Sequence, residues 1–573
     1  MKKILSLALA SVMVFALAAC AKQNTDSAPT DTDAPAESAD SAAAATDGVN
    51  PEPLPADLPS GNGTAINVFK ATTPETIDPT MNSSLDGGQY SAHLFEGLMR
   101  YKWDGSGIEH GMAEEYTVSD DGLTWTFKLR DSQWSDGQAV KAEDFVYAWR
   151  RLVNPEVASP YASDMGTFIM NGEKIIAGDL PKEELGVKAL DDKTLEVTLQ
   201  NPTSFFLQLA AFANFSPLRE DAVEPNGDNW TKTSDTFLSN GAFKMQSYAT
   251  DDRLIIVPNP GYWDAASIVP SQINFFFLAD DVAALAAFRA GEIDYIDTPP
   301  EEEVQALTND GLFGAVPQLG TYYVSYNTKK APLDNVNVRK ALTLAIDTDF
   351  IANTIRNGAV NAAEAFIGDG FATTDYDSDF RSGWQTYVAP SDYENNKALA
   401  RQALAEAGYP EGAGFPKLEY LFNDSTTHKA IGEALQNMWK TVLGIDVELK
   451  MTDWATVLQD RRNGNFDIAR NGWIADYNDP VTMLNLFTSN SGNNDGKYSS
   501  ADYDAKIAAS SKEADPAKRN QLLHEAEDIL IGQDWAMGPV FYYTITWAAN
   551  PKLKGWGVTP LGYQFFHKAY IEP

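Results

Sequence analysis

The sequence predicts an α/β protein in which helices pack on a mostly parallel sheet. The clearest observation is the alternation of strand-like and helix-like segments over residues 391–488, because such crossovers join parallel strands. The length of 573 residues, with 44% hydrophobic residues, is a second observation; it predicts a large core and two or more domains. The single cysteine excludes an internal disulfide, so the core alone must stabilise the fold.

The chain begins with a basic and then apolar segment that is typical of an export signal. Met1-Lys2-Lys3 precedes an apolar run that ends in Leu17-Ala18-Ala19-Cys20. This ending resembles the lipobox of bacterial lipoproteins, in which the cysteine is diacylated and the chain is cut just before it. The alternatives are an ordinary secretory signal with an incidental cysteine and an uncleaved anchor, although residues 4–19 fall short of the roughly 17–25 that span a bilayer. We predict a signal peptide over 1–19, lipidation of Cys20 and an extracytoplasmic location on the bacterial cell membrane.

Residues 20–60 are predicted to form a disordered acidic linker that tethers a folded body beginning near Gly61. Residues 25–60 contain no aromatic residue, no Lys and no Arg, and they are rich in Asp, Glu, Pro and Ala. Such a composition cannot bury enough apolar surface to offset the entropy of ordering the chain.

The charge of the chain excludes one class of partner. The 43 Lys and Arg residues against 80 Asp and Glu residues give a net charge of −37. Nucleic acids and anionic lipid headgroups would be repelled by such a surface, so we expect no nucleic-acid partner. The aromatic content of 11% fits either a large core or a cleft lined by rings, and composition leaves both interpretations open.

The N-terminal half contains apolar segments of both periods. Strand-like alternation or β-branched runs occur at 66–71, 123–130, 194–200, 254–258 and 273–278. Helical patterns occur at 141–154 and 282–292.

The C-terminal half shows the alternation more clearly. An amphipathic helix is predicted around 338–346, and Ser391-Asp392-Tyr393-Glu394 predicts a capping box that opens a helix ending before Gly408. The elements expected next are strand 418–423, helix 428–443 with Gly444 as its stop, strand 445–451, helix 454–463, strand 466–470 and helix 481–488.

Three strand-to-helix junctions of this region should meet at one edge of the sheet. They comprise residues 423–428, 452–454 and 472–480. Ligands of open α/β sheets bind outside the carboxyl ends of the strands, so a histidine, indoles and a carboxylate are expected in one crevice. Each of these residues alone is more often structural; their common placement favours a binding site.

Signatures of catalysis are missing. The sequence has no G-x-S-x-G, H-E-x-x-H, Walker A or G-x-G-x-x-G motif. The five histidines lack metal-ligand spacing, and one cysteine cannot build a zinc cluster. We therefore expect a protein that is not an enzyme and has no metal and no cofactor, although paired carboxylates for glycoside hydrolysis stay open in so acidic a chain.

Several ordered motifs identify a family. They are Leu94-Phe95-Glu96-Gly97-Leu98, Gly122-Leu123-Thr124-Trp125-Thr126-Phe127, Trp134-Ser135-Asp136-Gly137, Asn240-Gly241-Ala242-Phe243, Asn259-Pro260-Gly261-Tyr262-Trp263-Asp264 and Arg289-Ala290-Gly291-Glu292-Ile293-Asp294. From about residue 66 onward the chain resembles the solute-binding lipoproteins of peptide ABC importers (bacterial solute-binding protein family 5), especially the oligopeptide-binding proteins.

This resemblance implies a fold of the periplasmic-binding-protein type II, with two lobes joined by a hinge. The first lobe would comprise 61–320 plus 544–573 and carry an extra subdomain inserted at about 95–220. The second lobe would comprise 321–543.

The resemblance also implies a set of ligand contacts. Asp476, in Trp473-Ile474-Ala475-Asp476-Tyr477-Asn478, would form a salt bridge with the α-ammonium group of a peptide, whose main chain would pair with protein backbone as an added strand. The backbone around Trp473 and Asn493 matches such contacts. Positions that would meet the peptide carboxylate at different peptide lengths are His428, Arg461 and Arg470. Further ligand-binding positions are Gly472, Ile474, Trp454, Tyr161, Tyr542, Tyr323 and Leu85.

Some positions depart from the family pattern. Gly320 and Ile474 stand where some relatives carry a disulfide, Ser325 replaces an acidic pocket residue, and Asp297-Thr298 replaces an Asn pair. These changes affect the expected side-chain preference and leave the ammonium site intact.

The sequence thus predicts an extracytoplasmic, lipid-anchored receptor that binds oligopeptides and delivers them to an ABC importer. Its expected partners are the oligopeptide, the permease subunits and the membrane, and the protein is expected to be a monomer. The alternative is the same fold binding a non-peptide solute such as an opine, a metal chelate or a sugar. Asp476 discriminates between them, because a ligand without an ammonium group would leave it buried and unpaired. A secreted hydrolase or adhesin is a third and weaker interpretation.

Overall fold

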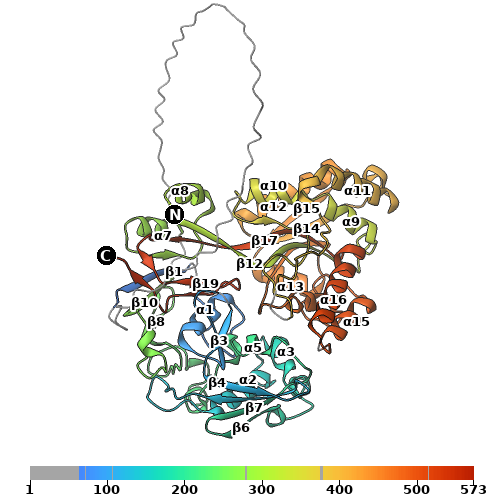
Figure 1. Ribbon diagram of the computed structural model, residues 1–573. Coiled ribbons are helices and arrows are strands. Elements are labelled where there is room, and N and C mark those ends of the chain that lie inside the picture. The colour runs from blue at the N-terminus through green and yellow to red at the C-terminus, as the bar shows by residue number, and fades with distance from the viewer. Residues whose placement is uncertain (1–62, 71–72, 106, 278–280, 375–377, 514) are drawn as a thin grey trace, which may run out of the picture. The chain divides into compact units, whose positions relative to one another are not determined.

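The computed structural model describes residues 63–70, 73–105, 107–277, 281–374, 378–513 and 515–573 (Figure 1). All of them belong to one compact unit of the chain, Thr46–Pro573. The predicted signal peptide, Cys20 and the predicted linker lie outside the described residues. Among the described helices, none is both long and apolar enough to cross a membrane.

One large sheet organises the structure. Its eleven strands include ten in the order β15-β14-β16-β12-β17-β11-β1-β10-β9-β8, and β13 pairs with β17. The strands are β1 (Ala65–Lys70), β8 (Phe243–Ala249), β9 (Arg253–Pro258), β10 (Gln272–Phe277), β11 (Tyr295–Ile296), β12 (Phe313–Tyr326), β13 (Asn361–Ala362), β14 (Leu418–Asn423), β15 (Val447–Thr452), β16 (Ile468–Ile474) and β17 (Met537–Ala549).

The prediction of a mostly parallel sheet is correct for only part of these strands. β14 is parallel to both β15 and β16, and β1 is parallel to both β10 and β11. β12 and β17 are antiparallel to their neighbours. The sheet is mixed because these two long strands run side by side in opposite directions.

β12 and β17 connect two groups of elements, which we call the N-terminal part (63–312 and 550–573) and the C-terminal part (327–536) (Figure 1). Their pairing is interrupted between Pro317 and Thr321. Proline has no N–H to donate to a ladder, so it is found at such irregular places. The lobe boundary predicted at residue 320 falls within this interruption.

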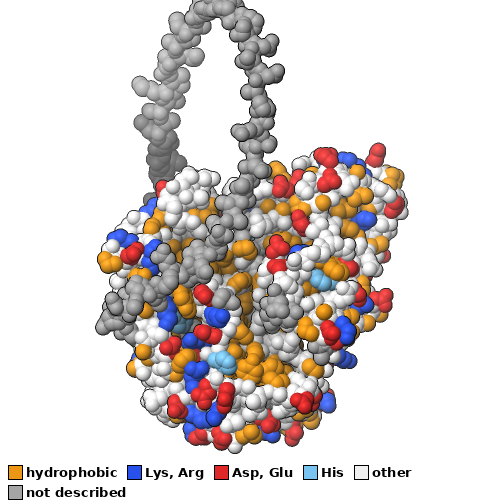
Figure 2. Space-filling model, in the orientation of Figure 1, with side chains coloured by type: hydrophobic (Ala, Val, Ile, Leu, Met, Phe, Trp, Pro, Cys, Tyr) orange, Lys and Arg blue, Asp and Glu red, His pale blue; other side chains and the backbone are white. Residues whose placement is uncertain are grey.

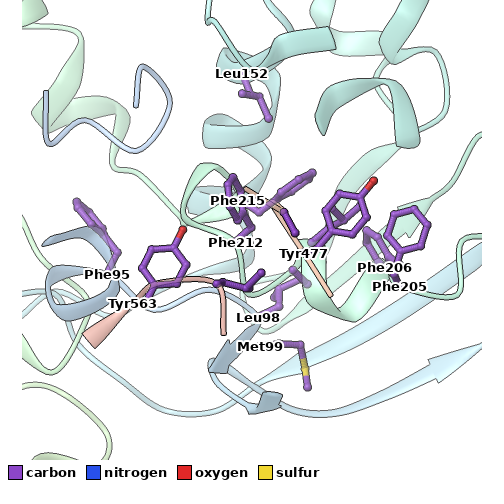
Figure 3. Packing of buried hydrophobic residues seen from close by; sticks show 14 of the residues in the cluster. Phe95, Leu98, Met99, Leu152, Phe205, Phe206, Phe212, Phe215, Tyr477 and Tyr563 are labelled. Atoms are coloured by element: carbon purple, nitrogen blue, oxygen red, sulfur yellow. The ribbon is translucent and has the colours of Figure 1, made fainter. Parts of the chain in front are cut away.

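The N-terminal part carries a second sheet of four strands. Their order is β4-β5-β7-β6, with β4 (Ala113–Val118), β5 (Thr124–Leu129), β6 (Val187–Asp191) and β7 (Thr194–Thr198). Helix α2 (Ala142–Val153) buries Phe145, Trp149 and Leu152 on one face, as its periodicity predicts. Trp149 packs edge-on against Phe215 at 4.9 Å, within a cluster of aromatic residues shown in part in Figure 3.

Short elements complete the N-terminal part. They are β2 (Met99–Tyr101), β3 (Ile108–His110), α1 (Leu85–Leu94), α3 (Ala162–Met165), α4 (Gly172–Ile176), α5 (Phe206–Leu209), α6 (Glu220–Val223), α7 (Asp281–Arg289), α8 (Val304–Asn309) and, from the end of the chain, β18 (Leu553–Lys554), β19 (Gly557–Val558), β20 (Gln564–Phe565) and β21 (Tyr570–Ile571).

Four helices of the C-terminal part lie close to their predicted ranges: α9 (Val336–Leu344), α11 (Tyr393–Glu406), α12 (Thr426–Leu443) and α13 (Trp454–Asn463). α14 (Val481–Leu484) is shorter than the predicted helix 481–488, and α10 (Thr348–Phe350), α15 (Ala501–Ser510) and α16 (Pro516–Glu527) were not predicted. Gly408 and Gly444 follow α11 and α12 with φ of 95° and 73°, a conformation that favours glycine at the end of a helix.

The predicted capping box of α11 is wrong. The helix begins one residue later than expected, with Asp392 as its N-cap, and no side chain caps the helix. Ser391 lies instead in a 3-10 turn formed by residues 390–392. Pro390 begins this turn, since its fixed φ suits the first position of a helical turn.

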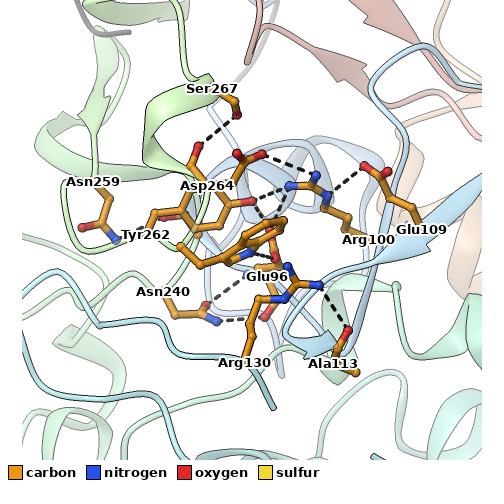
Figure 4. A network of polar contacts seen from close by, with 12 residues as sticks. Glu96, Arg100, Glu109, Ala113, Arg130, Asn240, Asn259, Tyr262, Asp264 and Ser267 are labelled. Carbon is orange, nitrogen blue, oxygen red and sulfur yellow. Dashed lines mark hydrogen bonds and ion pairs between the residues drawn. The ribbon is translucent and has the colours of Figure 1, made fainter. Parts of the chain in front are cut away.

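The motif Leu94–Leu98 has a structural role. The carboxylate of the buried Glu96 accepts hydrogen bonds from the Tyr262 hydroxyl and the Trp263 indole, and the Arg100 guanidinium donates to the same hydroxyl at 2.6 Å (Figure 4). The main chain of Glu96 is bonded by the side chain of Asn240. This network fixes the segment that follows α1 against the region that precedes β8.

Charged and apolar side chains are distributed differently on the surface. On the face shown in Figure 2, acidic and basic side chains are scattered, whereas hydrophobic side chains gather near the centre.

Candidate functional site

A cavity of about 340 Å³ lies where both parts of the chain meet beside β16. The C-terminal part contributes residues of α13 and β16 and the segment that follows β16. The N-terminal part contributes the start of α1, the segments beside α3 and α5, and the end of the chain. The lining residues are Asn82, Ser83, Ser84, Leu85, Tyr161, Phe212, Trp454, Arg470, Gly472, Trp473, Ile474, Ala475, Asp476, Tyr543, Leu561 and Tyr563.

β16 presents an open edge to this cavity. Its pairing with β14 ends at Leu421–Ala469, whereas β12 continues alongside it to Gly320–Ile474. The N–H of Ala475 donates to the carbonyl of Leu319 on β12 at 2.7 Å. Because main-chain groups alternate along a strand, those of Gly472 and Ile474 point toward the side where β14 has ended.

Asp476 lies directly beyond this edge. One carboxylate oxygen accepts a hydrogen bond from the Tyr161 hydroxyl at 2.8 Å, and the other lies 3.4 Å from the Thr482 hydroxyl. Burial raises the pKa of Tyr563 in the same wall, and the charge of Asp476 adds to this effect. The phenol of Tyr563 therefore stays neutral next to the carboxylate.

Arg470 places a positive charge in the same cavity. Its guanidinium lies over the rings of Trp454 and Tyr322 at 5.2 and 5.4 Å, a favourable arrangement for a cation. Within the described chain, the Nε atom of Arg470 and the Nε1 atom of Trp473 are buried without a hydrogen-bond partner. The cavity thus combines a carboxylate, a guanidinium and unpaired donors between aromatic walls.

His428 lies behind this wall. Its Nδ1 atom is 3.4 Å from the Tyr322 hydroxyl. Burial, followed by the charges of Arg470 and Arg356, lowers the pKa of His428 to about 3. The imidazole is therefore neutral at physiological pH and adds no charge to the site.

Comparison with known proteins places the chain in a family. Residues 107–495 match the model described as "Bacterial extracellular solute-binding proteins, family 5 Middle". The chain belongs to this family. Membership confirms the prediction of a binding protein rather than an enzyme, and family 5 proteins act outside the cytoplasm.

Individual family 5 proteins match most of the chain. The periplasmic oligopeptide-binding protein OppA of Salmonella typhimurium is 37% identical over 503 residues, which are 87% of this chain and 90% of that protein. The structure titled as Haemophilus influenzae OppA in complex with RPPGFSPFR has a TM-score of 0.76 at 33% identity and covers 89% of this chain and 99% of its own.

The murein tripeptide binding protein MppA of Escherichia coli is similar as well. One structure has a TM-score of 0.79 at 33% identity, with 89% of this chain and 99% of that chain covered. Its unliganded open form has a TM-score of 0.71. These neighbours confirm the predicted α/β fold of the periplasmic binding proteins.

The cavity brings together most of the contact residues expected from the family 5 resemblance. They are Asp476, Trp473, Ile474, Gly472, Trp454, Arg470, Tyr161 and Leu85. Gly320 and Ile474, where some relatives carry a disulfide, are paired residues of β12 and β16, which supports the alignment of this region.

Other expected contact residues lie outside the cavity. Arg461 lies behind it, where it donates to the Arg470 carbonyl at 3.1 Å and pairs with Asp495 at 3.0 Å. His428 is separated from the cavity by Tyr322. Asn493 lies in a turn, where its N–H donates to the Ser491 hydroxyl.

Two of the predicted tyrosines, Tyr323 and Tyr542, also lie outside the cavity lining. Tyr323 is buried against Phe366 and Phe487. The Tyr542 hydroxyl accepts from the N–H groups of residues 364 and 365, and the neighbouring Tyr543 lines the cavity instead. Successive side chains of a strand point to opposite faces, so Tyr542 and Tyr543 lie on opposite faces of β17.

Several lining residues were not expected from the sequence. They are Asn82, Ser83, Ser84, Phe212, Tyr543, Leu561 and Tyr563. Most lie in loops of the N-terminal part that have no periodicity. The high aromatic content was compatible with a cleft lined by rings, but composition does not identify which aromatic residues line it.

No metal site is found in the part of the chain that the structure describes, since no three His, Cys, Asp or Glu side chains are grouped as ligands there.

Proposed function

We propose that this protein is a lipid-anchored extracytoplasmic receptor that binds oligopeptides in the cavity beside β16 and delivers them to an ABC importer. The open edge of β16, with Asp476 just beyond it, carries the proposal. A peptide added at this edge would exchange main-chain hydrogen bonds with Gly472 and Ile474, as in other cases of strand addition. Main-chain pairing makes such binding tolerant of peptide sequence.

The charges of the cavity fit the two ends of a peptide. Asp476 provides a carboxylate for the α-ammonium group, and Arg470 provides a guanidinium for the carboxylate. Trp454, which is 45% exposed, and Trp473 offer apolar faces to side chains. Gly472 donates its N–H locally to Asn471 at 2.9 Å, a contact that a peptide carbonyl would replace.

The relatives support a peptide ligand. Similar proteins include an oligopeptide-binding and a murein tripeptide binding protein, and one of the similar structures is a complex with the nonapeptide RPPGFSPFR. Peptide-binding receptors of this family serve ABC importers, so we expect this protein to deliver its peptide to such an importer.

Lipid anchoring rests on the sequence around Cys20. We expect Cys20→Ser to abolish diacylation and to release the protein from the membrane fraction. A variant that stays membrane-bound and uncut would contradict the anchor and leave the peptide site untouched.

Calorimetry on Asp476→Asn tests the peptide site. Removing one partner of a buried charge pair costs roughly 2–5 kcal/mol, about thirty- to several-thousand-fold in affinity. The variant should lose most of its affinity for a free peptide, and the wild type should lose as much when the same peptide is N-acetylated. Asp310→Asn, at an exposed position that follows α8, is the matched control and should bind like the wild type.

Equal affinities of the wild type for the free and acetylated peptides would overturn the proposal. A non-peptide solute would then be the better interpretation of the cavity.

A further inference from the structure

The segment directly after Asp476 is held by residues of the N-terminal part. The ring of Tyr477 stacks on that of Phe205, with centroids 4.5 Å apart and planes at 5° (Figure 3). Phe168 adds an edge-on contact to Tyr477 at 6.5 Å. Tyr477 is only 3% exposed, so these rings exclude water from its surface.

Gln208 on α5 binds the main chain of the next residue. Its Oε1 atom accepts the N–H of Asn478 at 2.7 Å, and its Nε2 atom donates to the Asn478 carbonyl at 3.4 Å. The Gln208 residue is 7% exposed. These contacts bridge 270 residues of sequence and involve no side chain of the C-terminal part.

The same segment is fixed to its own part of the protein. The Asn478 side chain accepts from the N–H of Ala372 at 2.8 Å and donates to the Gly370 carbonyl at 3.3 Å. Asp479 pairs with both terminal nitrogens of Arg519, at 2.7 and 2.9 Å. Residues 477–479 therefore form a rigid support for Asp476, to which Phe205 and Gln208 attach.

Two cavities border these contacts. One of about 590 Å³ includes Phe205 and Arg519 in its lining, and one of about 550 Å³ includes Gln208 and Asn478. The N-terminal and C-terminal parts are thus not packed continuously here. A few residues make the contact between the N-terminal and C-terminal parts here, so each of them should contribute to the stability of the closed arrangement.

We propose that Phe205 and Gln208 are positioning residues that set peptide affinity without touching the peptide. Together with Tyr477 and Asn478 they form what we call the latch. The inference rests on the proposed function and on closure of the two parts around a peptide. When the parts close, the N–H of Asn478 leaves water and Gln208 accepts it. Closing without Gln208 would bury that N–H unsatisfied.

The latch should act uniformly on all ligands. The cavity lining beside β16 includes none of Phe205, Gln208, Tyr477 and Asn478, so a peptide held within that cavity leaves the latch contacts unchanged whatever its sequence. A receptor with a broken latch spends less time closed, and its apparent affinity falls by that fraction for every peptide. Opening should accelerate while the encounter of peptide with the open form is unchanged.

Gln208→Met tests the latch, because methionine keeps the length of the side chain and removes its hydrogen bonds. Stopped-flow fluorescence should show a dissociation rate about five- to a hundredfold faster, with an unchanged association rate. Two peptides of different sequence should show the same factor. The control is Gln200→Met at an exposed position whose side-chain hydrogen bond stays within the N-terminal part.

Phe205→Leu provides a second, independent variant. It removes the stack on Tyr477 while keeping an apolar side chain, and it should accelerate dissociation in the same uniform way. For Gln208→Met the melting temperature of the peptide-free protein should match the wild type, since its two hydrogen bonds to Asn478 form only when the parts are closed. Phe205 also packs against Phe168 within the N-terminal part, so Phe205→Leu is compared by its dissociation rate alone.

Two results would overturn the latch. One is an unchanged dissociation rate in both variants; the other is a loss that depends on the peptide used. These results are distinct from failure of the proposed function, which would appear as absent peptide binding, or indifference to acetylation, in the wild type itself.

Discussion

His524 on α16 shows how a single residue can set a pH dependence. Its ring is stacked between Phe380 and Trp384, with centroids 3.8 and 4.1 Å away. Its Nδ1 atom is buried without a hydrogen-bond partner in the described chain. Burial, and then the charge of Arg381, lowers the pKa of His524 to about 4.

This shift has a definite sign for stability. Between pH 6.5 and about 4 the unfolded chain binds a proton at His524 and the folded protein does not. The contribution of neutral His524 to the free energy of unfolding is therefore fully present above pH 6.5 and is lost as the pH falls toward 4. Between pH 7 and pH 4.5, the unfolding free energy of the wild type should fall by about 2–3 kcal/mol more than that of His524→Phe, which keeps the ring stack but has no group to protonate. Urea unfolding of the peptide-free protein measures this, and equal losses would contradict it.

The residue scale also shows what the sequence could not predict. The resemblance indicated Tyr542 on β17 as a contact residue, whereas the cavity lining beside β16 includes its neighbour Tyr543. Two interruptions shift the register between β12 and β17. A shift by one residue exchanges the two faces of a strand, and such bulges have no dependable signature in one sequence.

At the scale of elements, β16 is longer than predicted. The sequence indicated a strand that ends at Arg470, because Asn471 and Gly472 are typical of turns. The strand continues to Ile474 through its pairing with β12, so tertiary pairing overrides local propensity. The helices and strands with strong periodicity were predicted close to their observed ranges, as for α13 and β14.

The surroundings of position 472 explain why β16 contains a glycine there. A Cβ atom at this position would lie 2.2 Å from the Tyr543 hydroxyl. Gly472→Ala should therefore displace the Tyr543 ring from the cavity wall and weaken peptide binding by about tenfold, which corresponds to roughly 1.4 kcal/mol.

Calorimetry with one free peptide measures the effect. Asp310→Asn, at the exposed position after α8, is again the control and should bind like the wild type. Wild-type affinity of Gly472→Ala would show that the Tyr543 wall does not contribute to binding.

At the scale of the whole molecule, β12 and β17 join the N-terminal and C-terminal parts, and the cavity takes residues from both. The unliganded open form of MppA superposes less well on this chain than the other MppA structure does. We propose that the two parts close around a peptide by bending at the interruption near Pro317, as in other hinged binding proteins.

Closure should be visible in solution. Small-angle scattering should show a smaller radius of gyration when peptide is added, and contact of the peptide with Trp454 and Trp473 in the cavity wall should shift the intrinsic fluorescence. The Asp476→Asn variant, mixed with the same peptide, should show neither change. An unchanged radius at saturating peptide would contradict closure.

The α/β class and the family were accessible from the sequence, because motifs and periodicity are local, and the family resemblance supplied half of the residues that line the cavity. The contacts between α5 and residues 477–479 were not, since each member alone is an ordinary aromatic or amide residue. Only the fold brings Gln208 within reach of Asn478.

The open edge of β16 has one further consequence. Unpaired strand edges are templates on which other chains assemble into aggregates, and proteins protect them by covering or charging them. Here Trp454, Arg470 and the residues that precede α1 surround the exposed segment. A folded protein cannot bring a strand of its own into so small a recess, whereas a loose chain of a few residues can. The narrow recess that admits a peptide to the edge of β16 thus also protects the receptor from polymerising with its own copies.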